Sequence, residues 1–177
     1  TQSKIHVSRV RRGVYAAMFC AYASTSIVHA TVLDTLTPGQ WYMAPSSQLS
    51  AQDPCPARNC SYSGIGGQAE VVTAWSGGAY DTTRDRLIVW GGGHNDYGGN
   101  EIYAFDIATM TWSMVIGPTV TTTADRAENN ASNYYHDGTP SSRHTANALT
   151  YAANVDLFFS MATGATYGDP AGQGLDV

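Results

Sequence analysis

The sequence predicts an all-β protein built from four-stranded antiparallel sheets. The chain has 18 glycines and 11 tyrosines, and only 13% of its residues are charged. That composition is typical of a β protein with many turns. Short apolar runs alternate with turn residues between positions 71 and 116, and a similar stretch follows 71 positions later. The second copy indicates a repeated sheet unit.

The first 30 residues are predicted to be a secretory signal peptide. A basic segment comes first, with Lys4, Arg9, Arg11 and Arg12, and 15 apolar or small residues follow at 14–28. "VHA" at 28–30 then offers small residues at the two positions that signal peptidase reads. A membrane anchor would need about 20 apolar residues. We therefore expect a secreted or periplasmic protein whose mature part is 31–177, and no membrane partner after cleavage.

Removal of this segment would leave an acidic domain. Residues 1–30 hold four of the nine basic residues and none of the 14 acidic ones, so the remainder carries 5 − 14 = −9. A domain with this charge repels nucleic acid and anionic membranes. We expect neither as a partner.

Two cysteines remain outside the predicted signal peptide, Cys55 and Cys60 in "PCPARNC". A single pair in an exported chain predicts a disulfide that closes a tight loop. A metal site would need two further soft ligands nearby, and the sequence offers none there.

Four strands are predicted in one continuous stretch, at 71–80, 86–91, 101–106 and 111–116. The run "RLIVWGGG" is typical of a fully buried central strand that ends at glycines. Tight turns at 81–85 and 107–110 join the first strand to the second and the third to the fourth. Four short strands with such turns predict one antiparallel sheet.

The repeat predicts two further strands, at 144–151 and 156–162. "ALTYAANVDLFFSMATG" aligns with "GAYDTTRDRLIVWGGG", so that Tyr151 matches Tyr80 and Asp156 matches Asp85. "GLDV" at 174–177 then matches the start of the third strand of the first copy.

The residues at 86–112 resemble a kelch repeat. The features are the glycine pair Gly92 and Gly93 at the end of a strand, and Phe105 ahead of Trp112. Phe105 stands where kelch repeats more often have tyrosine. The resemblance implies a kelch-like β-propeller similar to the central domain of galactose oxidase. This chain would then be a fragment with about one and a half four-stranded blades and an N-terminal outer strand at 36–45.

The segment "GGGHNDYGGNE" at 91–101 is interpreted as the connection between the second and third strands. It precedes a strand, and no Lys-Ser/Thr pair follows, so it does not match a phosphate-binding loop. In an antiparallel sheet this connection leaves by the same end as the connections between blades. The long segments, 45–68, 91–100, 117–142 and 164–174, all belong to that end. Long loops are concentrated where function lies.

The candidate ligand-binding residues come from two of these loops. They are His94, Asn95, Asp96 and Tyr97 in the first, and Tyr134, Tyr135, His136, Asp137, Arg143 and His144 in and after the second. Aromatic rings, a carboxylate and an arginine suit the recognition of a sugar or polyol, by stacking and paired hydrogen bonds. Turn chemistry alone also favours Asn, Asp and Gly at such positions, so a structural role for each single residue stays open.

Three functions are consistent with this pattern. The first is a secreted binding module for a carbohydrate-like or protein ligand, which needs no cofactor or metal. The second is a secreted carbohydrate oxidase or lyase on the same fold. Galactose oxidase holds copper with tyrosine and histidine ligands and a Tyr–Cys crosslink, yet the mature chain has no cysteine beyond the predicted disulfide pair. The third is a structural surface component.

Overall fold

The computed structural model describes residues 32–45, 47–56, 66–93, 96–122, 125 and 133–161. The chain divides into two compact units, Thr1–Leu36 and Thr37–Val177. The described part of the first unit carries one 3₁₀ turn, η1 (Val32–Thr35). The predicted signal peptide lies outside the described residues. Within them, no helix has the length and apolar character needed to cross a membrane.

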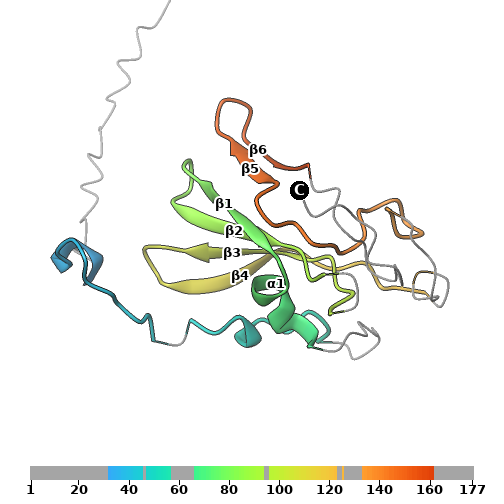
Figure 1. The fold of residues 1–177 in the computed structure, drawn as a ribbon, viewed down its shortest axis with the longest axis horizontal. Coiled ribbons are helices and arrows are strands. Elements are labelled where there is room, and N and C mark those ends of the chain that lie inside the picture. The colour runs from blue at the N-terminus through green and yellow to red at the C-terminus, as the bar shows by residue number, and fades with distance from the viewer. Residues whose placement is uncertain are drawn as a thin grey trace, which may run out of the picture. The chain divides into compact units, whose positions relative to one another are not determined.

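The second unit is mostly β. Four antiparallel strands form one sheet in the order β1 (Gly77–Asp81), β2 (Arg86–Trp90), β3 (Ile102–Asp106) and β4 (Thr111–Ile116) (Figure 1). A second, two-stranded sheet pairs β5 (Leu149–Ala152) with β6 (Leu157–Ser160). The four-stranded antiparallel sheet and the interior position of β2 confirm the sequence prediction. The described residues form no closed propeller.

The two hairpins repeat the same turn, as the 71-residue offset predicts. Asp85 and Asp156 both have φ of 53°, a left-handed conformation that aspartate tolerates better than most residues. Tyr80 donates a hydrogen bond to Asp85, and Tyr151 donates one of 2.6 Å to Asp156. Each tyrosine on the first strand of its hairpin therefore holds the aspartate that ends the turn.

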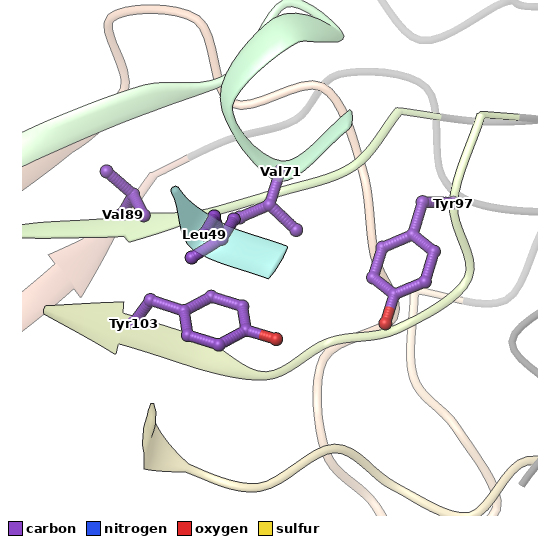
Figure 2. Packing of buried hydrophobic residues seen from close by; sticks show 5 residues of the cluster. All are labelled: Leu49, Val71, Val89, Tyr97 and Tyr103. Carbon is purple, nitrogen blue, oxygen red and sulfur yellow. The ribbon is translucent and has the colours of Figure 1, made fainter. Parts of the chain in front are cut away.

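One face of the four-stranded sheet packs against the segments that precede it. The Tyr103 cluster contains Leu49, Val71, Val89, Tyr97 and Tyr103 (Figure 2). Leu49 comes from the 3₁₀ turn η2 (Leu49–Ala51), and Val71 from the short helix α1 (Glu70–Thr73), which follows η3 (Gly67–Ala69). Burial of these side chains is the main force that holds the N-terminal segments on the sheet.

The other face packs against the second sheet. The Trp90 cluster contains Ala79, Trp90 and Leu149, with Ile102, Tyr151 and Phe158 packed around it. Val89 and Trp90 are adjacent in β2 and belong to opposite clusters, as the alternation of side chains along a strand requires. β2 is therefore covered on both faces, which explains its continuous apolar run.

The first predicted strand, 71–80, is wrong in its first half. Residues 70–73 form helix α1, and the strand begins only at Gly77. The helical turn brings Val71 into the Tyr103 cluster, where it is fully buried. Trp75 then has φ of 53°, which turns the chain into β1. Tertiary burial of one valine has overridden the strand propensity of the run.

The predicted strand at 144–151 begins later as well. Residues 144–148 form a turn, in which Ala146 has φ of 40° and Ala148 N–H donates to the carbonyl oxygen of Thr145. The N–H groups of Thr145 and Ala146 donate to the carbonyl oxygen of Trp75, at 3.1 and 2.6 Å. These bonds replace strand pairing at the start of the second hairpin.

The predicted outer strand at 36–45 forms no strand. Trp41 is 97% exposed and Met43 is also exposed. Pairing with another strand is what stabilises an edge strand, and no described strand pairs with this segment. Cys60 lies outside the described residues, so its disulfide with Cys55 stays a prediction.

Candidate functional site

One end of the four-stranded sheet gathers three separate connections. They are the approach to β1 around Trp75, the segment after β2 that starts at Gly91, and the turn that precedes β5. Tyr135 Oη donates to the carbonyl oxygen of Gly98 at 2.6 Å, which ties the long loop after β4 to the loop after β2. This contact brings the two loops together at one end of the sheet, as the sequence predicts.

Thr145 fixes this end of the sheet. Its hydroxyl accepts a hydrogen bond of 2.8 Å from Gly77 N–H and donates one of 2.9 Å to the carbonyl oxygen of Trp90. Gly77 and Trp90 are the paired end residues of β1 and β2. A Cβ at Gly77 would lie 1.8 Å from the carbonyl oxygen of Ala146, so only glycine permits this approach.

His144 stands at the centre of a small cluster at this end. The imidazole is buried, its ring centroid lies 6.0 Å from that of Trp75, and its Nε2 lies 3.7 Å from Asp96 Oδ2. Gly93 completes the cluster with φ of 80°; a Cβ there would lie 2.2 Å from Asp96 Oδ2. We call Trp75, Gly93, Asp96 and His144 the Trp75 site.

The outer residues of the Trp75 site are accessible. Trp75 is 70% exposed although it is a large aromatic residue, and the Asp96 side chain is 34% exposed. An exposed indole offers an apolar face for stacking, and a carboxylate that shares the neighbour His144 can accept hydrogen bonds from a polar ligand. The site can therefore hold a ligand that has one flat apolar face and donor groups at its edge.

Behind this end lies a buried carboxyl group, Glu101. Its Oε1 accepts hydrogen bonds of 2.8 Å from both Tyr97 and Tyr103, and Gln68 Nε2 donates 2.8 Å to the Tyr103 hydroxyl. The rings of Tyr97 and Tyr103 lie in the same cluster (Figure 2). Burial raises the pKa of Glu101, and the hydrogen bonds from the two tyrosines oppose that rise only in part. Tyr97, which the sequence predicts to bind ligand, is therefore a buried core residue.

Two more predicted ligand residues are buried and bonded to the protein itself. Tyr135 accepts from Ser142 N–H at 3.3 Å, in addition to its bond to Gly98. Arg143 donates to the carbonyl oxygens of Asn133, at 2.6 Å, and Ser141, at 3.1 Å, and lies 5.9 Å over the Trp90 ring. Both residues therefore stabilise the loop after β4, and we do not count them among the candidate ligand-binding residues.

A second polar pair lies in the same loop. Asp125 is buried, and its Oδ2 lies 2.8 Å from Nδ1 of His136, whose side chain is 48% exposed. Burial alone would raise the pKa of Asp125. Hydrogen bonds from the Thr122 N–H and hydroxyl, and from His136, outweigh burial and lower that pKa to about 2. The carboxylate is ionised at neutral pH and orients the imidazole.

Tyr134, His136 and Asp137 surround a short turn. Tyr134 is exposed and Tyr135 is buried, as alternation along an extended segment requires. Asp137 accepts hydrogen bonds from Thr139 N–H, at 2.9 Å, and from the Thr119 hydroxyl, at 2.8 Å. A hydrogen bond of 2.7 Å from the Thr139 hydroxyl is the largest cause that lowers the pKa of Asp137, and the other two bonds lower it further. Asp137 therefore has a structural role in this turn, which is the alternative that its residue type left open.

A cavity of about 320 Å³ lies between the two sheets, lined on its apolar side by Trp90, Ile102, Ile116 and Phe158. Its polar residues Asn100, Thr119 and Thr139 bond to one another: Asn100 Nδ2 donates 2.9 Å to Thr139 Oγ1, and Thr119 N–H donates 2.8 Å to Asn100 Oδ1. Because these groups are satisfied internally, we place the candidate site at Trp75 and not in the cavity.

Comparison with protein-family models, curated proteins and solved structures finds no match for this chain. The resemblance to kelch repeats therefore stays a prediction that rests on the sequence motif. No group of three His, Cys, Asp or Glu side chains suited to a metal ion occurs within the part of the chain that the structure describes.

The sequence prediction and the site overlap in part. Asp96 and His144 belong to both, whereas His94 and Asn95 lie outside the described residues. The sequence prediction misses Trp75, because it takes the run at 71–80 as one strand and Trp75 as a strand residue. The nearest sequence signal is the glycine pair Gly77 and Gly78, with which β1 begins.

Proposed function

We propose that this domain is a ligand-binding module that takes a carbohydrate-like ligand at the Trp75 site. The carrying observation is an indole that is 70% exposed and shares the neighbour His144 with an accessible carboxylate. An exposed indole presents a flat apolar face, and sugar rings stack on such faces. The loops that carry the site are held by many internal hydrogen bonds, so the site is largely preformed.

We also propose that the four-stranded sheet is one blade of a kelch-like β-propeller and that the second hairpin begins the next blade. Support comes from the order β1 to β4, from the repeated Tyr–Asp turn, and from Gly91, Gly92 and Gly93, which all have positive φ. In that fold the connections between strands two and three and between consecutive blades leave by the same end, because the strands of a blade are antiparallel. Export of the domain, to the periplasm or the outside, is part of the same proposal.

A glycan array tests the binding proposal. The array would carry neutral, acidic and amino-sugar glycans. It would be probed with the unchanged protein and with the variants Trp75→Asn and Trp41→Asn. Asparagine is enriched in the left-handed conformation of Trp75, so the first variant removes the ring and keeps the backbone. Trp41 is 97% exposed and lies outside the site, so its variant is the matched control. We expect the chain and Trp41→Asn to bind the same glycans and Trp75→Asn to lose them; equal binding by all three would refute the site.

A specific observation favours a second candidate, an acid–base enzyme such as a lyase. Asp125 holds Nδ1 of His136 and leaves Nε2 as the ring nitrogen that can exchange a proton with a substrate. In this candidate His136 is the base and Tyr134, exposed two residues earlier, contacts the substrate. Product release from polysaccharides, followed by ultraviolet absorption of new double bonds, tests it: activity that disappears in His136→Gln and falls in Asp125→Asn supports the enzyme, and an inactive chain supports the binding module.

A further inference from the structure

We propose that the Trp75 site selects a cationic amino sugar, a glucosamine-type unit with a free protonated amine, over neutral and anionic sugars. This inference rests on the proposed function, because it names the ligand class of the same site. It draws on the face that Trp75 presents, the charge of Asp96, and the positions of the basic side chains around them.

The backbone that carries the Trp75 indole is held in place. The Trp75 carbonyl oxygen accepts hydrogen bonds from the N–H groups of Thr145 and Ala146, and the Ser76 hydroxyl donates one of 3.1 Å to the carbonyl oxygen of Glu70. A backbone held this way loses little conformational entropy on binding. Tryptophan is also the aromatic side chain that attracts a cation most strongly over its face.

The Asp96 carboxylate is available to a ligand. Oδ2 lies 3.7 Å from His144 Nε2, beyond hydrogen-bonding distance, so this contact does not use the acceptor. The Asp96 carbonyl oxygen accepts hydrogen bonds of 3.2 Å from both Gly66 and Gly67, which fixes the residue in place. A charged carboxylate and an ammonium group form a hydrogen bond roughly twice as strong as a neutral pair.

No described arginine is positioned to bind an anionic ligand at this site; the imidazole of His144 is buried behind Asp96. The described arginines are Arg84, Arg86 and Arg143. Arg143 is buried and bonded to the carbonyl oxygens of Asn133 and Ser141, while Arg84 and Arg86 bond to Asp81 at the opposite end of the sheet. The whole chain carries a net charge of −5. Among the described residues, the accessible charge at the site is the Asp96 carboxylate, which favours a cation over uronic acids and sulfated sugars.

A sugar fits better than a basic peptide. A glucosamine unit presents an apolar ring face to the indole and, at its edge, both hydroxyl donors and one ammonium group. A lysine side chain presents the charge without a flat face of that size, so it would leave most of the exposed indole uncovered. A lysine pentapeptide is therefore included in the test as the competing ligand.

Calorimetric titration with three hexasaccharides of one backbone tests the inference. The β-1,4-linked hexamers of glucosamine, N-acetylglucosamine and glucose differ only at the C2 substituent. At about pH 5.5, below the ordinary pKa range of an amine, we expect glucosamine hexamer to bind about ten times more tightly than the other two at low salt. The difference should shrink at high salt, because screening weakens an exposed ion pair.

Variants separate the charge from the ring. Asp96→Asn should reduce binding of glucosamine hexamer to the level of the neutral hexamers, and Trp75→Asn should remove binding of all three. Asp85→Asn, at the opposite end of the sheet, is the matched control, because it removes one negative charge and keeps a residue that tolerates φ of 53°. Circular dichroism and thermal unfolding of each variant confirm that it is folded.

The outcomes distinguish the two proposals. Equal binding of the three hexamers, lost in Trp75→Asn, would overturn the amine preference and leave the sugar-binding proposal standing. Binding of none of them, with Asp96-dependent binding of the lysine pentapeptide, would overturn both in favour of a protein ligand. Unchanged binding of glucosamine hexamer by Asp96→Asn would also overturn the preference, because the selected charge would then lie elsewhere.

Discussion

Arg84 and Asp156 form a bidentate ion pair, with Nη1–Oδ1 and Nη2–Oδ2 distances of 2.6 and 2.5 Å, that joins the turns of the two hairpins. Tyr151 adds a hydrogen bond of 2.6 Å to Thr83 of the first turn. The two turns are equivalent in the sequence repeat, so this ion pair links the same position of two consecutive repeats. The hydrogen bonds from Arg84, ahead of that from Tyr151, lower the pKa of Asp156.

Arg84→Gln should lower the melting temperature only slightly. Both side chains of the pair are substantially exposed, at 43% for Arg84 and 50% for Asp156, and exposed ion pairs contribute little to stability. Thermal unfolding of the chain and the variant at low salt and at high salt measures the effect. The difference between them should vanish at high salt; a loss that is independent of salt would show that the arginine acts through packing.

Asp125→Asn should destabilise the domain by about 2 kcal/mol at neutral pH. The pKa of Asp125 is about 2 in the folded state, against about 3.9 in an unfolded chain. A depressed carboxyl pKa contributes stability that is present above the unfolded value and is lost as pH falls through the folded value. Urea unfolding from pH 2 to 7 should show the gap between chain and variant closing between about pH 4 and pH 2. A gap that does not change with pH would contradict the assignment.

The free energy of unfolding of Glu101→Gln should exceed that of the unchanged chain by an amount that grows as pH rises. The pKa of Glu101 is raised by burial, so above about pH 4.3 the unfolded chain releases a proton that the folded state keeps. Stability of the unchanged chain therefore falls with rising pH until the folded pKa is passed. Glutamine keeps the shape and the acceptor for Tyr97 and Tyr103 and has no such loss. Urea unfolding at pH 5 and pH 8 measures both, and a difference that shrinks with pH would be the contrary result.

Thr145→Val should cost about 1–3 kcal/mol. The substitution keeps the shape of a buried side chain but removes both hydroxyl hydrogen bonds, to Gly77 N–H and to the carbonyl oxygen of Trp90. Those two backbone groups would then be left without this partner at the end of the sheet. Thr82→Val, at an exposed turn position, is the matched control and should change the free energy of unfolding little. Equal effects of the two would mean that Thr145 does not fix the end of the sheet.

Much of the sheet could be predicted from the sequence, because its signals are local. The buried run of β2, the short turn after Asp81 and the repeat of Tyr80 and Asp85 at Tyr151 and Asp156 each specify a hairpin within a few residues. The helix at 70–73 and the turn at 144–148 could not be predicted in this way. Their conformations depend on contacts with distant residues, namely burial of Val71 beside Tyr103 and bonds of Thr145 to β1 and β2.

The candidate site was predictable to a smaller extent. Residue type indicated Asp96 and His144, but a tyrosine or arginine in a long loop gives no sign of whether it faces solvent. Tyr97, Tyr135 and Arg143 face inward because each bonds to another residue of the protein, as Tyr135 does to the distant carbonyl oxygen of Gly98. The exposure of Trp75 likewise depends on the turn at that residue.

Hydrogen–deuterium exchange with and without glucosamine hexamer, or with the strongest glycan of the array if that is another, shows whether ligand binds at the loop-bearing end of the four-stranded sheet. We expect slower exchange in peptides that contain Trp75, Asp96 and His144, and no change in peptides of the two tight turns at 82–85 and 107–110. Protection confined to those turns, or to the exposed segment around Trp41, would contradict this expectation.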